Sequence, residues 1–281
     1  MSETAQLATV EAPLIFLRPM EGRPRIYLYD PPPGVPVRTG TYDPQSVSIA
    51  DARPVAGSLS LDAHGFALIH APSAVKDFTD EALIRRVYYP EVERLIGEAT
   101  GAELVVTFDH TIRNAARAER REPGIREPVG RTHNDFTLRS GPERARRELE
   151  ARGLDADRLL RQRFAIVNLW RTTGRPVERW PLALCDARTI APDELVTTDL
   201  LYPDRVGEIH AVMYGPQQRW FYFPKVRADE AILIKVYDSR DDVARFTAHG
   251  AFDDPATRLD APERESIETR TVVIYPEEAA R

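Results

Sequence analysis

The chain has 281 residues, of which 42% are hydrophobic, so it is long enough to bury a sizeable core. Its formal net charge is −6, and its only basic concentration is the short Arg117, Arg120, Arg121 cluster, which argues against a nucleic-acid partner. It has no apolar run of 18 residues, no basic and apolar leader at its start, and one cysteine, Cys185, which excludes an intrachain disulfide. We therefore expect a cytoplasmic protein without a membrane span. The composition favours a small-molecule partner only weakly, because most soluble domains share it.

The first part of the chain alternates strand patterns with turns and one clear helix. Residues 25–29 read as a strand that ends in a proline-rich turn, and residues 65–70 read as a second strand. Residues 80–100 carry apolar side chains at helical spacing, so we predict a helix there despite Pro90. Residues 104–108 then read as a buried strand.

The second part of the chain is dominated by strand patterns. Residues 113–131 are rich in Arg, Glu, Pro and Gly and predict a solvated loop, whereas residues 141–162 have a helical pattern. Five apolar runs predict further strands, at residues 165–170, 211–214, 220–223, 231–237 and 271–275. Helices early and strands in series predict an α+β protein built mostly on an antiparallel sheet or barrel.

The run His133-Asn134-Asp135 is the strongest chemical signal in the sequence. On a strand, residues i and i+2 project to the same face, so the imidazole and the carboxylate would point together and Asn134 away. His133 is the only one of six histidines followed by an acidic residue at i+2. With a third ligand from another strand, the pair would form the 2-His-1-carboxylate set that binds Fe(II) and leaves positions open. The competing interpretation is a polar cluster on an exposed turn.

A second histidine and a polar strand pattern lie near the C-terminus. Arg264 follows His249 by 15 residues and begins an alternating run with Ser266, Glu268 and Arg270, which would share one face of a strand. Such a stripe suits a polar ligand, and an arginine fork suits the distal carboxylate of 2-oxoglutarate. An exposed edge strand is the alternative.

The third ligand is thus His249 or His210. Arg219 follows His210 by nine residues, but no alternating polar run begins there. We prefer His249 because its arginine opens the polar stripe, and we keep His210 as the alternative.

These residues resemble the Fe(II)/2-oxoglutarate-dependent oxygenase superfamily. Within it, the chain is most similar to a branch that includes the fungal meroterpenoid endoperoxidase, a cephamycin methoxylation component and gibberellin-desaturase-like proteins. The resemblance covers about residues 60–276 and is carried by segments in the family's order: residues 131–137, 167–171, 181–188, 219–224, 229–231, 235–239, 249–255 and 264–270. The chain departs from the pattern at two positions, with Ala248-His249-Gly250 where Pro-His-Thr is usual, and Gln218 where a histidine often stands.

The resemblance implies a double-stranded β-helix, a cupin-like jelly-roll barrel with flanking helices. It implies one oxygenase domain over residues 1–281, with residues 1–60 as a strand-containing extension and residues 60–276 as the catalytic barrel and helices. The expected ligands of iron are His133, Asp135 and His249. The expected binding residues for 2-oxoglutarate are Arg264, Ser266 and Arg171, although Arg171 and the neighbouring candidate Asn168 fall on opposite strand faces by parity.

The expected activity is oxidation of a small organic, secondary-metabolite-like substrate with O₂, by hydroxylation, desaturation or a related C–H oxidation. Two alternatives stay open: a metal-binding cupin hydrolase or isomerase that does not use 2-oxoglutarate, and a non-catalytic binding protein on the same fold. A methyltransferase is disfavoured because the glycines of residues 97–101 follow a helix, where Gly101 is better explained as its C-cap. A homodimer is compatible with the sequence, which does not determine the oligomeric state.

Overall fold

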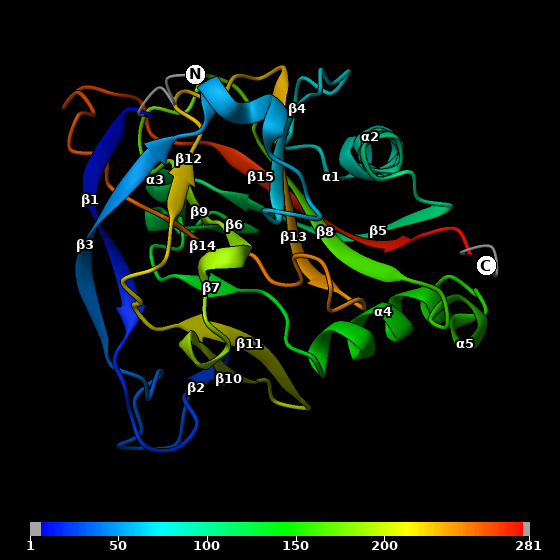
Figure 1. Ribbon diagram of the computed structural model, residues 1–281, viewed down its shortest axis with the longest axis horizontal. Coiled ribbons are helices and arrows are strands. Elements are labelled where there is room, and N and C mark those ends of the chain that lie inside the picture. Colours follow the sequence, from blue (N-terminus) through cyan, green and yellow to red (C-terminus); the bar gives the residue numbers. More distant parts are fainter. Residues whose placement is uncertain (1–6, 278–281) are drawn as a thin grey trace, which may run out of the picture.

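The computed structural model describes residues 7–277, and two facing β-sheets form its body (Figure 1). The larger sheet has nine strands in the order β1 (Thr9–Leu17), β3 (Tyr42–Asp51), β12 (Trp220–Tyr222), β9 (Leu182–Cys185), β14 (His249–Ala251), β7 (His133–Asn134), β11 (Val206–Val212), β10 (Leu195–Leu201) and β2 (Arg25–Tyr27). The smaller sheet has six strands in the order β4 (Phe66–His70), β13 (Glu230–Asp238), β8 (Phe164–Thr172), β15 (Ser266–Ile274), β5 (Leu104–Arg113) and β6 (Ile125–Arg126). Most neighbouring strands are antiparallel, as predicted, and the two sheets form a double-stranded β-helix.

The central strands of the smaller sheet are buried on both faces. On β8, Ile166 and Trp170 face the space between the two sheets, whereas Val167 and Leu169 face outward. The outward face is covered by a helix, so every residue of β8 is buried. Continuous burial explains why these strands read as unbroken apolar runs rather than as alternating ones.

One long helical segment covers that outward face, at the upper right of Figure 1. It consists of α1 (Glu81–Leu83), a π-helical turn (Ile84–Tyr88) and α2 (Tyr89–Thr100). Pro90 lies in the first turn of α2, where its missing N–H costs little, and the wider turn before it accommodates the ring. Gly101 ends the helix with φ +68°, which confirms its predicted role as C-cap.

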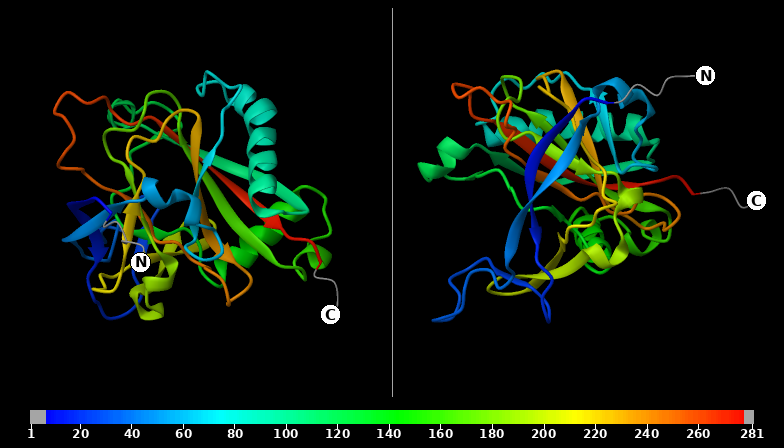
Figure 2. Two further views of the ribbon diagram at one scale, coloured as in Figure 1. Left: turned by 45° about the horizontal axis from the view of Figure 1, so that its top comes forward. Right: turned by 60° about the vertical axis from the view of Figure 1, so that its left-hand side comes forward.

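The remaining helices lie at the ends of the barrel. The predicted helix at residues 141–162 is two helices, α4 (Ser140–Ala151) and α5 (Ala156–Leu159), separated at Gly153 with φ +69°. Their apolar side chains join the core between the sheets. In Figure 2 the two green helices lie at the end of the sheets nearer the C-terminus. The predicted loop at residues 113–131 contains α3 (Ala115–Glu119) and the short β6.

The N-terminal strands belong to the larger sheet. The sequence pattern missed β1, β3, β9 and β10. It predicted a strand at residues 25–29, where the structure has the shorter β2. Strand β1 contains Pro13, which is tolerated because β1 lies at the edge of the sheet. On its other side it makes isolated bridges at Ile15 and Leu17, away from Pro13. Since β3 pairs with β12, the segment before residue 60 is continuous with the larger sheet. The single-domain organisation over residues 1–281 stays a prediction. Among the described residues, no helix is long and apolar enough to cross a membrane.

Candidate metal centre

Two histidines meet because their strands are neighbours in the larger sheet. In the ladder between β7 and β14, His133 stands directly opposite His249, and directly opposed side chains lie close together. Their ring centroids are 4.5 Å apart. His249 also pairs with Leu184 of β9, whose side chain belongs to the core between the sheets. Both imidazoles therefore point into the barrel.

The backbone fixes the tautomer of both imidazoles. His133 Nδ1 lies 2.9 Å from the carbonyl oxygen of Arg131, and His249 Nδ1 lies 2.9 Å from that of Thr247. A carbonyl only accepts, so each Nδ1 carries the proton and each Nε2 keeps a free lone pair. Burial and the neighbouring His133 lower the pKa of His249, which favours the neutral form that binds metals.

Asp135 completes the group on the same face. Its Oδ1 lies 3.5 Å from His133 Nε2, and the ligand atoms of His133, Asp135 and His249 all lie within 4.8 Å of one another. Its Oδ2 accepts hydrogen bonds from Asn168 Nδ2 at 2.7 Å and Arg270 Nε at 3.3 Å. Burial alone would raise the pKa of this carboxyl, but Arg270 and the two imidazoles hold it well below its usual range.

A network of charges from the polar stripe of β15 supports the carboxylate. Arg270 donates to Glu268 Oε2 at 2.6 Å and to Asp109 Oδ1 at 3.1 Å, in addition to Asp135. Burial opposes the charge of Arg270, yet these three carboxylates outweigh it and raise the pKa of the guanidinium. Glu268 also accepts from Asn168 at 3.2 Å, and its Oε1 lies 4.0 Å from His249 Nε2. The predicted one-face stripe therefore points into the barrel.

The other end of the stripe carries buried polar atoms without partners. Arg264 is 3% exposed, donates from Nη1 to the carbonyl oxygen of Trp180, and has an Nε that no protein atom satisfies. Ser266 is 1% exposed, and its hydroxyl also lacks a partner. Burial and Arg113 lower the pKa of Arg264 to about 9, so the guanidinium still carries its charge at neutral pH. Buried polar groups are normally paired, so these atoms are expected to meet a ligand.

A narrow cavity joins the histidines to this cation. It is lined by both imidazoles, by Glu268 and Arg264 from the stripe, and by Arg113 from β5. Two neutral imidazoles and a carboxylate are the donor set of a non-haem Fe(II) site, and a buried guanidinium suits a carboxylate. The residues present therefore fit both Fe(II) and a dicarboxylic co-substrate such as 2-oxoglutarate.

Two of the candidate residues from the sequence lie outside this group. His210 stands opposite Asn134 in the ladder between β11 and β7, so it faces away from His133 and the barrel interior. Arg171 is on the outward face of β8. Its guanidinium lies 5.8 Å from the centre of the Tyr88 ring and donates a hydrogen bond to the carbonyl oxygen of Ala228. Parity separates it from Asn168, and the geometry leaves Arg171 out of the co-substrate cavity.

Sequence reasoning missed the role of Asn134 and the presence of Arg113. Asn134 is fully buried and donates from Nδ2 to the carbonyls of Phe136 and Val236, while its Oδ1 accepts from the amide of Thr247. It thus fixes the two segments that carry Asp135 and His249. Arg113 was assigned to the edge of a loop, because the run of apolar residues that signals β5 ends before the strand does.

Comparisons with known proteins show the family to which the chain belongs. A family model described as oxidoreductase/YMDC permease-like domain matches residues 14–274. The chain belongs to the Fe(II)/2-oxoglutarate-dependent dioxygenases, and the enzyme class expected from the sequence is confirmed. Its cofactors are Fe(II), 2-oxoglutarate and O₂, and its substrate is a small organic molecule.

Two fungal relatives and one solved structure are similar to the chain over most of its length. The Fe(II)/2-oxoglutarate-dependent dioxygenase nvfI of Aspergillus novofumigatus is 34% identical over 273 residues, covering 94% of this chain and 96% of the relative. The hydroxylase/desaturase efuI of Hormonema carpetanum is 31% identical, covering 84% of this chain and 86% of the relative. The solved structure of the iron and alpha-ketoglutarate-dependent endoperoxidase NvfI has a TM-score of 0.85 at 30% identity, with 96% of this chain and 99% of that chain covered.

Proposed function

We propose that His133, Asp135 and His249 bind the Fe(II) of this enzyme and that Arg264 and Ser266 bind the C5 carboxylate of 2-oxoglutarate. The observation that carries the proposal is the single cavity that runs from the two imidazoles to a buried, partly unpartnered guanidinium. Iron and 2-oxoglutarate together supply the activation of O₂, which is coupled to decarboxylation of the co-substrate.

The chain's own side chains hold and orient these groups. The carbonyls of Arg131 and Thr247 keep the proton on each Nδ1, so each Nε2 is aimed at the metal. Asn168 and Arg270 hold Oδ2 of Asp135 and leave Oδ1 for coordination. Arg264 has a planar fork for bidentate contact with a carboxylate, and the Ser266 hydroxyl lies on the same face of the stripe. The apolar walls, including Leu182 and Trp170, exclude water from this end.

The substrate class follows from the relatives. Four of the relatives are named hydroxylase/desaturase, and the solved structure is that of an endoperoxidase. We propose that this enzyme oxidises a C–H bond of a secondary-metabolite-like molecule, by hydroxylation, desaturation or a related reaction. A cytoplasmic location fits its single, buried, unpaired Cys185. A homodimer stays a prediction that sedimentation would test.

The anaerobic Fe(II) protein, titrated with 2-oxoglutarate, tests the proposal directly. Chelation of iron by the co-substrate gives a visible metal-to-ligand charge-transfer band. We expect Arg264→Met to need about 10- to 150-fold more 2-oxoglutarate for half-saturation, because a charged hydrogen bond contributes about 1.5–3 kcal/mol. Arg94→Met, on the exposed side of α2, is the matched control and should behave as the wild type. Equal half-saturation in both variants would show that Arg264 does not bind the co-substrate.

The sequence alone also left a cupin hydrolase or isomerase open, an alternative that the family of the chain excludes. Such an enzyme would bind metal at the same three residues but would have no use for the buried guanidinium. Formation of succinate from 2-oxoglutarate by wild-type protein, and its loss in His133→Ala, would separate the two. Iron-loaded, folded protein that shows no charge-transfer band and no succinate would contradict the proposed co-substrate site.

A further inference from the structure

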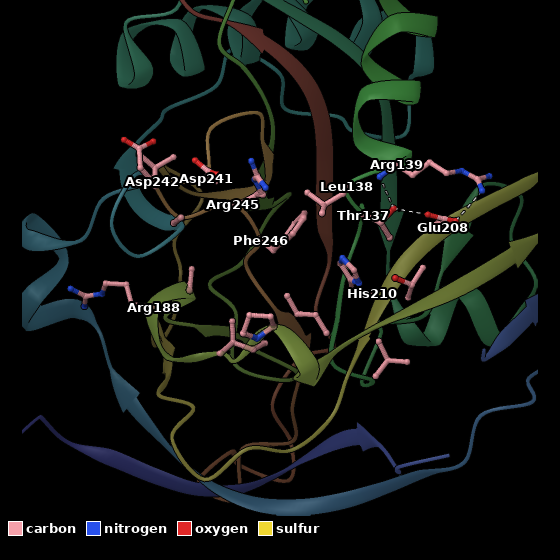
Figure 3. Close-up of a pocket in the computed structure, with 18 of the residues that line it drawn as sticks. Thr137, Leu138, Arg139, Arg188, Glu208, His210, Asp241, Asp242, Arg245 and Phe246 are labelled. Carbon is pink, nitrogen blue, oxygen red and sulfur yellow. Dashed lines mark hydrogen bonds and ion pairs between the residues drawn. The ribbon is translucent and has the colours of Figure 1, made fainter. Parts of the chain in front are cut away.

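A large cavity lies on the opposite face of β7 and β11 from the metal centre. Its volume is about 1300 Å³, and its walls include the apolar side chains of Ile190 and Val196. Leu138 and Phe246 also line it (Figure 3). None of its lining residues belongs to the proposed metal or co-substrate site. Organic ligands usually occupy cavities of about 300–1,000 Å³, so this one has room for a molecule of several rings.

His210 contributes buried polar atoms to the wall of the cavity. Its side chain lies beside Phe246, with ring centroids 5.0 Å apart, and it is 7% exposed (Figure 3). Both ring nitrogens are buried without a partner. Burial lowers the pKa of His210 to about 4, so at neutral pH the ring is uncharged and offers one donor and one acceptor.

Most of the charged residues that line the cavity pair with other groups of the protein. Glu208 accepts from Thr137 at 2.7 Å and pairs with Arg23 and Arg139. Arg188 at the rim pairs with Asp186 at 2.7 Å, and Arg245 donates to two backbone carbonyls. The buried polar atoms without a partner that face this cavity are the two ring nitrogens of His210, and that ring is uncharged, so an uncharged ligand is favoured.

We propose that the cavity around His210 is a second ligand site for an uncharged apolar organic molecule with a carbonyl or hydroxyl group. The group would hydrogen-bond to His210, and the rings would pack on Phe246, Val196 and Leu138, which is 60% exposed at the mouth. The site is separate from the proposed iron and 2-oxoglutarate site, since no residue lines both cavities.

Titration with prodan tests the site. Prodan is an uncharged naphthalene ketone whose emission shifts to the blue in apolar surroundings. We expect saturable, blue-shifted binding by the full chain. Val196→Trp should fill the cavity and weaken binding at least about tenfold, and His210→Phe should weaken it about three- to tenfold through the lost hydrogen bond. Val206→Trp, on the same hairpin but 47% exposed and outside the cavity, is the control and should bind as the wild type.

Three results would overturn the proposal. The first is equal prodan affinity in Val196→Trp and Val206→Trp, with folding of both checked by circular dichroism. The second is displacement of prodan by 2-oxoglutarate added with Fe(II) under anaerobic conditions, which would place the probe in the metal centre. The third is a dimer, seen by sedimentation velocity, that Val196→Trp dissociates, because the cavity would then be covered by a second copy of the chain.

Discussion

Replacing Arg270 by methionine would leave the carboxylates that this cation now neutralises without their partner. The guanidinium lies 3.3 Å from Asp135, 2.6 Å from Glu268 and 3.1 Å from Asp109. The first two carboxylates are largely buried, whereas Asp109 is 39% exposed and contributes less because water screens it. Loss of one partner of a buried ion pair costs about 3–5 kcal/mol. We expect the metal-free Arg270→Met protein to lose about this much free energy of unfolding.

The same variant should also bind iron less tightly. Arg270 and Asn168 orient the carboxylate that would coordinate the metal, and loss of such an orienting partner typically costs about 10- to 100-fold in affinity. Anaerobic calorimetric titration with Fe(II) measures this loss of affinity. Urea unfolding of the metal-free protein measures the loss in free energy of unfolding. Arg94→Met is again the control, with an expected change within about 0.5 kcal/mol.

The pH dependence provides a further check with a defined sign. The folded-state pKa of Asp135 is depressed, so its contribution to stability is present above the unfolded value of about 3.9 and is lost as pH falls through the folded value. Without Arg270 that pKa rises toward the unfolded value, so the contribution of Asp135 to stability shrinks, and its loss on acidification is smaller and complete at a higher pH. Adding Glu268→Gln to Arg270→Met should recover part of the stability, because it removes one of the buried charges left without a partner. If Arg270→Met matched Arg94→Met, or if Glu268→Gln made it worse, the reasoning about this network would fail.

Three other substitutions test separate features. Arg171→Met should leave the KM for 2-oxoglutarate within about twofold of wild type in a succinate assay, because the guanidinium lies against Tyr88 outside the barrel; a tenfold rise would return it to the co-substrate site. Asn134→Leu should cost about 2–4 kcal/mol in urea unfolding, since it leaves buried carbonyls and an amide unpaired, and a neutral result would contradict its bracing role. Gly141→Ala should cost about 1–3 kcal/mol, because its new Cβ would lie 2.4 Å from the ring of Tyr237; unchanged stability would mean that the ring moves freely.

The buried parts of the fold were the most predictable from sequence. Strands such as β8 and β13 are covered on both faces, so their apolar runs stand out, and the helix at residues 80–100 has a clear apolar stripe. The missed strand β3 begins Tyr42-Asp43-Pro44-Gln45, a composition that local propensity assigns to a turn. It is a strand because β1 and β12 pair with it on either side, and pairing between distant segments leaves no local signal.

The candidate site was predictable where the alternation of side chains along a strand decides which residues share a face. Parity correctly put the side chains of His133 and Asp135 together, and it gathered the stripe from Arg264 to Arg270 on one face. The choice between His249 and His210 needed the strand order, because the sequence does not say which histidine lies opposite His133. Parity also warned that Asn168 and Arg171 could not share a face. The partners of Arg270 on β5 could not be foreseen, since they depend on register across the sheet.

The histidines and the carboxylate of the metal centre differ in what maintains them. The acceptors that orient the two imidazoles are main-chain oxygens, which persist whatever side chains stand at positions 131 and 247. The carboxylate depends instead on two particular side chains, Asn168 and Arg270. Redesign of the surrounding pocket could therefore alter many residues without disturbing the imidazoles. A change at either side-chain partner would act first on the acidic ligand, which makes Asp135 the sensitive point for anyone adapting this scaffold to new substrates.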